Sequence, residues 1–131
     1  MDYFATQKLL RQDPEAEPFP YNIFWWQGMD GSRVLSHVFK KNNANFDAGD
    51  LITRWEEDRI QQENIDGLMY PFGFGDGGGG PTRDMLEIAR RCADLEGAPR
   101  CRMESPVHYF ERAKANGVEN IFAGELYLAW H

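Results

Sequence analysis

Residues 22–39, Asn-Ile-Phe-Trp-Trp-Gln-Gly-Met-Asp-Gly-Ser-Arg-Val-Leu-Ser-His-Val-Phe, hold the two most strand-like segments of the chain. The apolar run at 22–26 lacks polar alternation, which is typical of a strand covered on both faces. Asp30-Gly31 is a turn dipeptide, and an extended pattern resumes from Val34 to Phe39. The sequence therefore predicts either a hairpin or a strand and its return.

Strand-like and helix-like segments alternate along the rest of the chain. Apolar residues three or four apart among charges predict amphipathic helices, and short apolar runs between turn residues predict strands. The expected strands lie at 3–6, 68–72, 101–103 and 121–128, and the expected helices between Asp47 and Asn64, from Pro81-Thr82 to about Leu95, and from Ser105-Pro106 to Asn116-Gly117. Short loops between strands and helices indicate βαβ units, so we expect an α/β fold with a parallel sheet.

Length and charge limit the classes of function. The 131 residues suffice for one compact segment, 1–131, but fall short of a closed β/α barrel. With 42% apolar residues the chain is too hydrophobic for disorder, and its apolar runs are too short to cross a bilayer. The formal net charge of −7 repels nucleic acids and anionic lipids. We therefore expect a soluble globular segment with neither nucleic acid nor membrane as a partner.

The cysteines and the start of the chain bear on its location. The helix that starts at Pro81-Thr82 is expected to bury Met85, Ile88, Ala89 and Cys92. Cys92 and Cys101 flank the turn after it and are interpreted as ordinary small buried residues of a reducing compartment. Residues 1–4 have neither the basic nor the apolar region of a secretion signal. The expected location is therefore cytoplasmic.

The glycine-rich stretch at 72–82, Phe-Gly-Phe-Gly-Asp-Gly-Gly-Gly-Gly-Pro-Thr, is the sharpest candidate for a site. It follows an expected strand and precedes an expected helix, the junction at which α/β proteins build their sites. Its glycines allow close approach of the backbone to a ligand, and Asp76 is the side chain among them that can titrate. Asp76 is therefore a candidate acid/base, although a turn with a solvated aspartate fits the same residues.

The same loop also matches the dinucleotide pattern Gly-x-Gly-x-x-Gly at Gly73, Gly75 and Gly78. A nucleotide-binding α/β module is thus the alternative function. Against it, Asp76 would repel the phosphates that such a loop collects, and Pro81 removes an amide donor at the start of the helix. A calorimetric titration with a dinucleotide distinguishes the two hypotheses.

Aromatic residues and histidines supply the remaining candidates. Trp25 and Trp26 lie beside a polar turn, where an indole can stack on a sugar ring. Adjacent strand residues point to opposite faces, so at most one indole can face a site, and we assign Trp26 to the core. The three histidines, His37, His108 and His131, show no ligand spacing, and no metal-binding residue is predicted.

Three blocks in order resemble the catalytic domain of glycoside hydrolase family 38, the retaining zinc-dependent α-mannosidases. The first runs from Phe19-Pro20 through residues 24–34 to His37 and resembles the family's Trp-x-Gly-x-Asp-Gly-Ser block. The second, residues 72–83, resembles its Gly-Asp-Gly-Gly-Gly-Gly-Pro-Thr signature. The third is Gly-Glu-Leu-Tyr-Leu at 124–128 with His131. The resemblance covers nearly the whole chain.

The resemblance implies that the chain is a segment of a seven-stranded β/α barrel-like domain that cleaves α-mannosides with retention. In the family an aspartate at the position of Asp76 is the candidate general acid/base. The implied substrate contacts are Trp25, Asp30, His37, Lys8, Gly75 and Gly77.

The resemblance also implies what the segment lacks. The nucleophile and the zinc ligands of the family have no counterpart in this sequence, so zinc belongs to the longer parent enzyme. We therefore expect a mannose-containing glycan or mannoside as the substrate of the parent, no activity of this segment alone, and self-association through barrel faces left uncovered.

Overall fold

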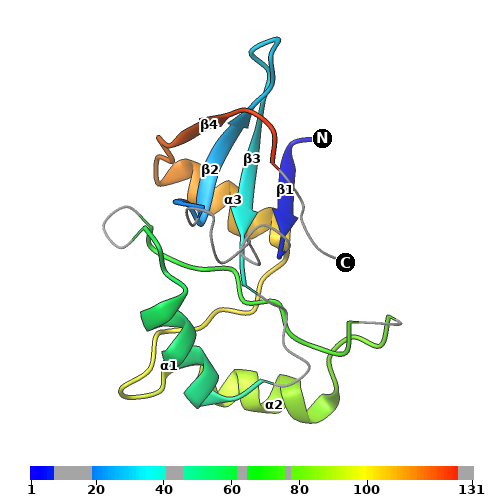
Figure 1. Cartoon of the computed structure of the whole chain (residues 1–131). Coiled ribbons are helices and arrows are strands. Elements are labelled where there is room, and N and C mark those ends of the chain that lie inside the picture. The colour runs from blue at the N-terminus through cyan, green and yellow to red at the C-terminus, as the bar shows by residue number, and fades with distance from the viewer. Residues whose placement is uncertain (8–18, 41–45, 62–64, 76–77, 127–131) are drawn as a thin grey trace, which may run out of the picture. The chain divides into compact units, whose positions relative to one another are not determined.

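Figure 1 shows the computed structural model of the chain, which describes residues 1–7, 19–40, 46–61, 65–75 and 78–126. The elements are β1 (Tyr3–Thr6), β2 (Ile23–Gln27), β3 (Arg33–Val38), α1 (Ala48–Glu57), α2 (Arg83–Arg91), the short 3-10 helix η1 (Cys92–Asp94), α3 (Pro106–Ala115) and β4 (Ile121–Ala123). The chain divides into two compact units. The first unit contains residues 1–40, 60–69 and 105–131, and the second unit contains residues 41–59 and 70–104. Within the described ranges, no helix combines the length and the apolar composition that a bilayer span requires.

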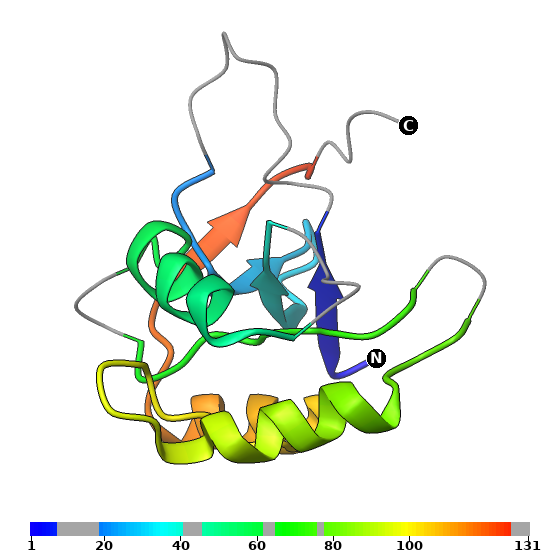
Figure 2. The same cartoon turned by 90° about the horizontal axis from the view of Figure 1, so that it is seen from below.

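The first unit is built on a four-stranded sheet with the strand order β1-β3-β2-β4. β2 and β3 are antiparallel, whereas β1 runs parallel to β3 and β4 runs parallel to β2. Figures 1 and 2 both show the pair β2 and β3 between the edge strands β1 and β4. The predicted mixture of helices and sheet is confirmed. The expected all-parallel sheet is wrong, because the described sheet is mixed, and it is open rather than closed into a barrel.

A tight turn makes β2 and β3 antiparallel. The N–H of Gly28 donates to the carbonyl of Ser32 at 2.9 Å, and the N–H of Gly31 donates to the carbonyl of Gly28 at 3.0 Å. Gly31 has a φ of 80°, a left-handed conformation that glycine adopts without steric cost. Of the two alternatives that the sequence leaves open, the hairpin is therefore correct.

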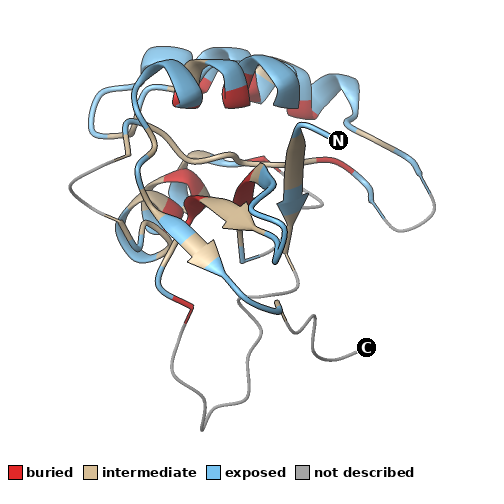
Figure 3. Cartoon of the chain, turned by 90° about the horizontal axis from the view of Figure 1, so that it is seen from above, coloured by how far each residue is buried: buried red, intermediate tan, exposed pale blue. Residues whose placement is uncertain are grey.

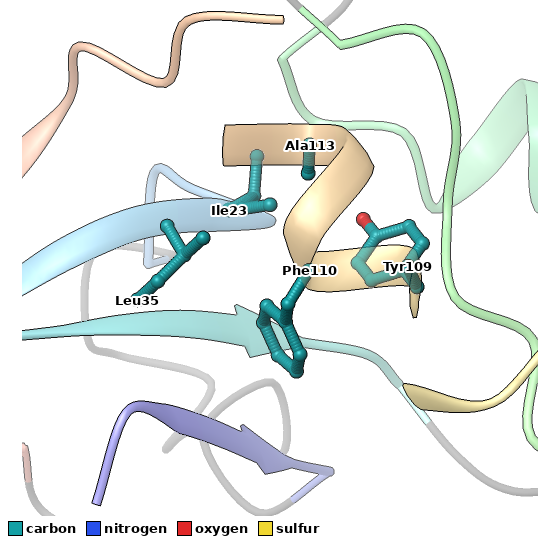
Figure 4. Packing of buried hydrophobic residues seen from close by; sticks show 5 residues of the cluster. All are labelled: Ile23, Leu35, Tyr109, Phe110 and Ala113. Carbon is teal, nitrogen blue, oxygen red and sulfur yellow. The ribbon is translucent and has the colours of Figure 1, made fainter. Parts of the chain in front are cut away.

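Helix α3 covers one face of this sheet. As predicted, Ser105 is the N-cap of this helix, and its hydroxyl accepts a hydrogen bond from the N–H of His108. Figure 4 shows Ile23 and Leu35 of the strands together with Tyr109, Phe110 and Ala113 of the helix. These five residues form one buried cluster. Burial of their apolar surface is what holds the helix on the sheet.

The opposite face of the sheet carries a second cluster, rich in aromatic residues. Its buried members are Phe19, Phe24 and Val38, and Trp26 and Phe122 pack against them. Figure 3 shows that the edge strands β1 and β4 contain no buried position, whereas the central strands do. The sheet is therefore apolar on both faces along its centre, as the run at 22–26 predicts.

The second unit contains α1, α2 and η1 around a core of its own. The buried residues of this core are Phe46, Leu51, Met85, Ala89 and Cys92. Local capping defines where the helices begin. The carboxylate of Asp47 accepts from the N–H of Asp50 at 2.9 Å, and the hydroxyl of Thr82 accepts from the N–H of Met85 at 3.2 Å.

Several predicted boundaries are corrected by the structure. The segments 68–72 and 101–103 are not strands, and the last strand ends at Ala123 within the described residues. Pro81 precedes the N-cap Thr82 and is not in the first turn of α2. Ile88, expected on the buried face of α2, is 39% exposed. The errors at 68–72 and 101–103 have one cause, since an apolar extended segment becomes a strand only where it finds a neighbouring strand to pair with.

Candidate functional site

The turn between β2 and β3 presents Asp30 to solvent. One carboxylate oxygen of Asp30 accepts hydrogen bonds from the hydroxyl of Ser32 at 2.6 Å and from the N–H of Ser32 at 3.0 Å. These bonds, the hydroxyl first, hold the pKa of Asp30 below its usual range. Asp30 is therefore a fixed, charged acceptor, and its second oxygen is the one that can receive a hydroxyl group of a ligand.

The two tryptophans of β2 face opposite sides of the sheet, as predicted. The indole N–H of Trp25 donates to the carbonyl of Val118 at 2.9 Å, and this ring packs on the α3 side. The indole N–H of Trp26 donates to the carbonyl of Gly124 at 2.9 Å, on the opposite face. Both tryptophans are half-buried. Each indole N–H is thus already engaged by backbone, and a ligand would meet the ring rather than the N–H.

His37 is buried in the middle of the sheet. In register it lies between Ala5 of β1 and Ile23 of β2, and it is 0% exposed. Its Nε2 accepts from the N–H of Met69 at 3.4 Å, and its ring meets the ring of Tyr109 edge-on at 5.2 Å. Burial lowers the pKa of His37 to about 3, so the imidazole is neutral near pH 7. Its Nδ1 has no hydrogen-bond partner among the described residues.

The glycine-rich loop of the second unit is closed at its base by backbone hydrogen bonds. Phe74 and Gly80 exchange N–H···O bonds of 2.9 and 2.7 Å, and the N–H of Gly78 donates to the carbonyl of Gly75 at 2.9 Å. Gly73 has a φ of 117°, and a Cβ there would lie 2.6 Å from the nitrogen of Pro81. Glycine is therefore required at this position by sterics.

The predicted residues at the tip of this loop fall outside the described part of the chain. They are Asp76 and Gly77, whereas Gly75 is described and exposed. Lys8 and His131 also lie outside the described residues. The positions of the proposed acid/base and of the basic substrate contact therefore stay predictions.

The start of α2 does not favour the nucleotide alternative. In nucleotide-binding loops the first amides of the helix are free to receive phosphate. Here the N–H of Met85 donates to the hydroxyl of Thr82, and the N–H of Thr82 contacts the sulfur of Met85 at 3.4 Å. Asp84 adds a negative charge in the first turn. Both features weaken the attraction of this helix end for an anion.

The described residues of the predicted site that belong to the first unit do not form one cluster. Asp30 lies at the exposed tip of the hairpin, while His37 lies near its buried opposite end and Trp25 lies between them. Gly75 belongs to the second unit. Among the described residues, no three His, Cys, Asp or Glu side chains are grouped so that they could hold a metal ion. The described part of the chain therefore does not fit a zinc site by itself.

A pocket of about 440 Å³ in the first unit was not predicted from the sequence. Asp66, Gly67, Asn116 and Gly117 are among the residues that line it. The amide of Asn116 donates to the carboxylate of Asp66. This hydrogen bond joins the dipeptides Asp66-Gly67 and Asn116-Gly117, which the sequence alone shows only as residues that end helices. Of the predicted site residues that the structure describes, none lines this pocket.

Comparison with known proteins covers almost the whole chain. The family described as the glycosyl hydrolases family 38 N-terminal domain matches residues 1–130. The chain is 34% identical over 130 residues to human alpha-mannosidase 2C1, which covers 98% of this chain and 12% of the human protein. It is 33% identical over 135 residues to alpha-mannosidase G of Dictyostelium discoideum, covering 100% of this chain and 12% of that protein. It is 32% identical over 143 residues to alpha-mannosidase of Saccharomyces cerevisiae, covering 100% of this chain and 13% of that protein. The chain thus spans a small fraction of the length of these relatives.

Proposed function

This chain belongs to glycosyl hydrolase family 38, within its N-terminal domain, and we propose that it is a segment of the catalytic domain of an α-mannosidase. The parent enzyme would hydrolyse terminal α-mannosidic bonds of glycans or mannosides. The observation that carries the proposal is the match over residues 1–130, which includes the Gly-Asp-Gly-Gly-Gly-Gly-Pro-Thr signature at 75–82. In the parent, the open sheet of the first unit would be part of a larger β/α barrel-like sheet.

Asp76 is the proposed general acid/base of that reaction. In a retaining glycosidase, one carboxylic acid protonates the leaving oxygen, and a second carboxylate attacks the sugar. The first group then accepts a proton from the water that releases the sugar. The glycines on either side of Asp76 carry no side chains, and this supports a role in which a sugar comes close to its carboxyl group. The nucleophile would come from the rest of the parent enzyme.

The proposed substrate contacts of the parent enzyme are Trp25, Asp30, Lys8, Gly75 and Gly77, and the sequence also offers His37 as a candidate. Asp30 suits a hydrogen bond to a sugar hydroxyl, because its carboxylate is exposed and charged. Burial and the contact with Met69 favour a positioning role for His37, in which it would support β3.

In the parent enzyme, residues outside this chain would bind the zinc. The bound zinc would help to orient the sugar and to stabilise developing charge. We therefore propose that the 131-residue chain alone is inactive. A cytoplasmic location is proposed with it, because the two free cysteines suit a reducing compartment. The open edges at β1 and β4 favour self-association of the isolated segment.

The first test is hydrolysis of an aryl α-mannoside, with and without added zinc. It compares this chain with the same chain extended by its natural flanking sequence. Activity of the extended chain alone supports the proposal. Hydrolysis by this chain alone would refute the proposed inactivity, and an inactive extended chain that binds zinc and folds would refute the family function.

The second test addresses Asp76 in the active extended chain. Asp76→Asn is expected to lower kcat for a substrate with a poor leaving group by roughly 10²–10⁴-fold. Azide should restore turnover of an activated aryl mannoside and yield a mannosyl azide of retained configuration, because azide needs no base to attack the sugar–enzyme intermediate. Asp94→Asn is the matched control, since Asp94 is exposed and paired only with Arg100 among the contacts that the structure gives it. Unchanged kcat in Asp76→Asn would exclude this role.

A further inference from the structure

The two cysteines lie on opposite arms of one turn in the second unit. Cys92 begins η1 and is 5% exposed, while Cys101 follows the turn and is half-buried. Cys92 belongs to the buried cluster around Phe46, and Cys101 packs against that cluster. Both are free thiols. From the sequence, the two cysteines are interpreted only as ordinary small buried residues. In the fold they lie at the same buried cluster.

Two contacts pair the arms of this turn. The N–H of Cys101 donates to the carbonyl of Ala93 at 3.0 Å, and the guanidinium of Arg100 donates to the carboxylate of Asp94 at 3.1 Å. Ala93 is the residue directly after Cys92. The backbone hydrogen bond therefore brings Cys101 beside the residue adjacent to Cys92, and a disulfide requires this close approach of two backbones.

Electrostatics within the turn agree with this adjacency. The pKa of Cys101 is raised, first by burial and second by the charge that Cys92 would carry as a thiolate. Such an influence falls with distance, so it agrees with the adjacency that the backbone hydrogen bond between Cys101 and Ala93 shows. The raised pKa also means that the Cys101 thiol stays protonated near pH 7, which slows its oxidation without preventing it.

We propose that Cys92 and Cys101 form a reversible intramolecular disulfide when the chain meets a disulfide oxidant such as oxidised glutathione. Cys101 is the more exposed thiol and reacts first. Its thiolate attacks one sulfur of the oxidant, breaks the S–S bond and releases one glutathione. The thiolate of Cys92 then attacks Sγ of Cys101, forms the Sγ–Sγ bond and releases the second glutathione. The cysteines lose two electrons, the oxidant gains them, and the two thiol protons end on the two glutathiones.

The disulfide would link the end of α2 and η1 to the segment that leaves the turn. It would constrain the unfolded chain while leaving the paired arms in place, so the second unit should become harder to unfold. Oxidation would thus stabilise the unit that carries the glycine-rich loop. This inference does not depend on the enzymatic activity proposed for the parent.

Tryptic mapping detects the bond directly in the 131-residue chain. The chain is incubated with a glutathione redox buffer, its remaining thiols are blocked, and it is digested. Trypsin cleaves after Arg91, Arg100 and Arg102, so the disulfide joins the peptide 92–100 to the dipeptide 101–102. We expect the joined peptide, about 2 Da lighter than the sum of the two thiol peptides. Glutathione on Cys101 without the joined peptide would overturn the proposal.

A second measurement distinguishes disulfide formation that the fold favours from formation that follows only from the short sequence separation of the two cysteines. The equilibrium between dithiol and disulfide is measured in native buffer and in urea, because any two cysteines this close in sequence can react in an unfolded chain. We expect the disulfide to be favoured at least about tenfold more in native buffer, since the paired arms raise the effective concentration of one thiol at the other. Equal or weaker formation in native buffer would overturn the proposal. Cys92→Ser and Cys101→Ser are the matched controls, which can form only mixed disulfides.

Discussion

The backbone N–H of Met69 donates a hydrogen bond of 3.4 Å to Nε2 of His37. Because Nε2 accepts, the proton of the neutral ring lies on Nδ1. The rings of Tyr109 and Phe39, at 5.2 and 6.2 Å, give His37 an apolar environment. Protonation of the ring would place a charge in this environment and remove the acceptor that Met69 uses.

The first prediction is therefore that acid destabilises the fold through His37. Burial lowers its pKa from the ordinary 6.5 to about 3, so between these values the unfolded chain binds a proton that the folded chain does not. The stabilising effect of the neutral ring is full above pH 6.5 and is lost as the pH falls toward 3. The free energy of unfolding should fall by about 1.4 kcal/mol for each pH unit in this window. Urea unfolding at a series of pH values measures this slope.

His37→Gln is the matched control for that slope. Its amide oxygen can accept from Met69, but the side chain does not titrate. This variant is expected to be less stable at pH 7 and to lose most of the slope between pH 6 and 4. An unchanged slope would mean that other groups, such as the carboxylates of Asp30 and Glu87, cause the acid sensitivity.

The second prediction compares two glycines with left-handed backbones. Gly31 has a φ of 80°, and a Cβ added there would meet no atom within 4 Å. Gly31→Ala should therefore lower the free energy of unfolding only through the strain of a left-handed alanine, by about 1–2 kcal/mol. Gly73 has a φ of 117°, and its Cβ would lie 2.6 Å from the nitrogen of Pro81 and 2.7 Å from the carbonyl carbon of Gly80. Gly73→Ala should therefore cost about 3 kcal/mol or more, with the loop rearranged. Urea unfolding of the two variants side by side tests the ranking, and equal costs would argue against the closed base of the loop.

The third prediction concerns the titration of Asp30. Its pKa is lowered chiefly by the hydroxyl of Ser32, at 2.6 Å. Ser32→Ala removes that donor and keeps the backbone donor, so the pKa of Asp30 should rise part of the way toward its ordinary value. Carboxyl-detected NMR titration measures the change. Ser105→Ala, in the N-cap of α3, should leave the titration of Asp30 unaltered, and a similar shift in both variants would contradict the assignment.

Sequence alone predicted the features that depend on near neighbours. The helix start at Ser105 and the turn at Asp30-Gly31 were predicted because a cap or a turn is completed within a few residues. The opposite faces of Trp25 and Trp26 follow from the period of a strand. The glycine-rich loop was singled out by its composition and by family resemblance, while the role of Asp76 stays a prediction.

The features that the sequence did not reveal depend on distant partners. Residues 68–72 have the composition of a strand but form no strand in the described structure, where of these residues only Phe72 takes part in a β-bridge, and nothing within the segment reveals this. The burial of His37 cannot be read from its own neighbours in sequence, because it depends on Tyr109 and on Met69, which is 32 residues away. The contact between Asn116 and Asp66, which borders the pocket, joins residues 50 positions apart. Such pairings are set by tertiary packing rather than by local pattern.

The last prediction concerns Gln61, whose side chain fixes the start of β2. Its Oε1 accepts from the N–H of Asn22 at 2.7 Å and from the N–H of Ile23 at 2.8 Å. Gln61→Ala leaves two backbone donors without their acceptor and should cost about 2–3 kcal/mol in the free energy of unfolding. The Nε2 of Gln61 has no partner among the described residues, so the acceptor is the half of the amide that matters.

Gln61→Glu keeps an acceptor oxygen at this position and removes the NH2 donor of the amide, so it tests the acceptor by itself. A carboxylate can accept both N–H groups more strongly than an amide and carries no donor that needs a partner, so at pH 7 this variant should stay within about 1 kcal/mol of the wild type. Because hydrogen bonds to the charged form lower the pKa of a carboxyl group, its advantage over Gln61→Ala should persist above the ordinary glutamate pKa and shrink as the pH falls through the lowered value. Urea unfolding of both variants at pH 7 and pH 4 measures this difference. If Gln61→Glu were as unstable as Gln61→Ala at pH 7, the cost would come from lost packing or buried charge, and the two hydrogen bonds could not be what holds β2 in place.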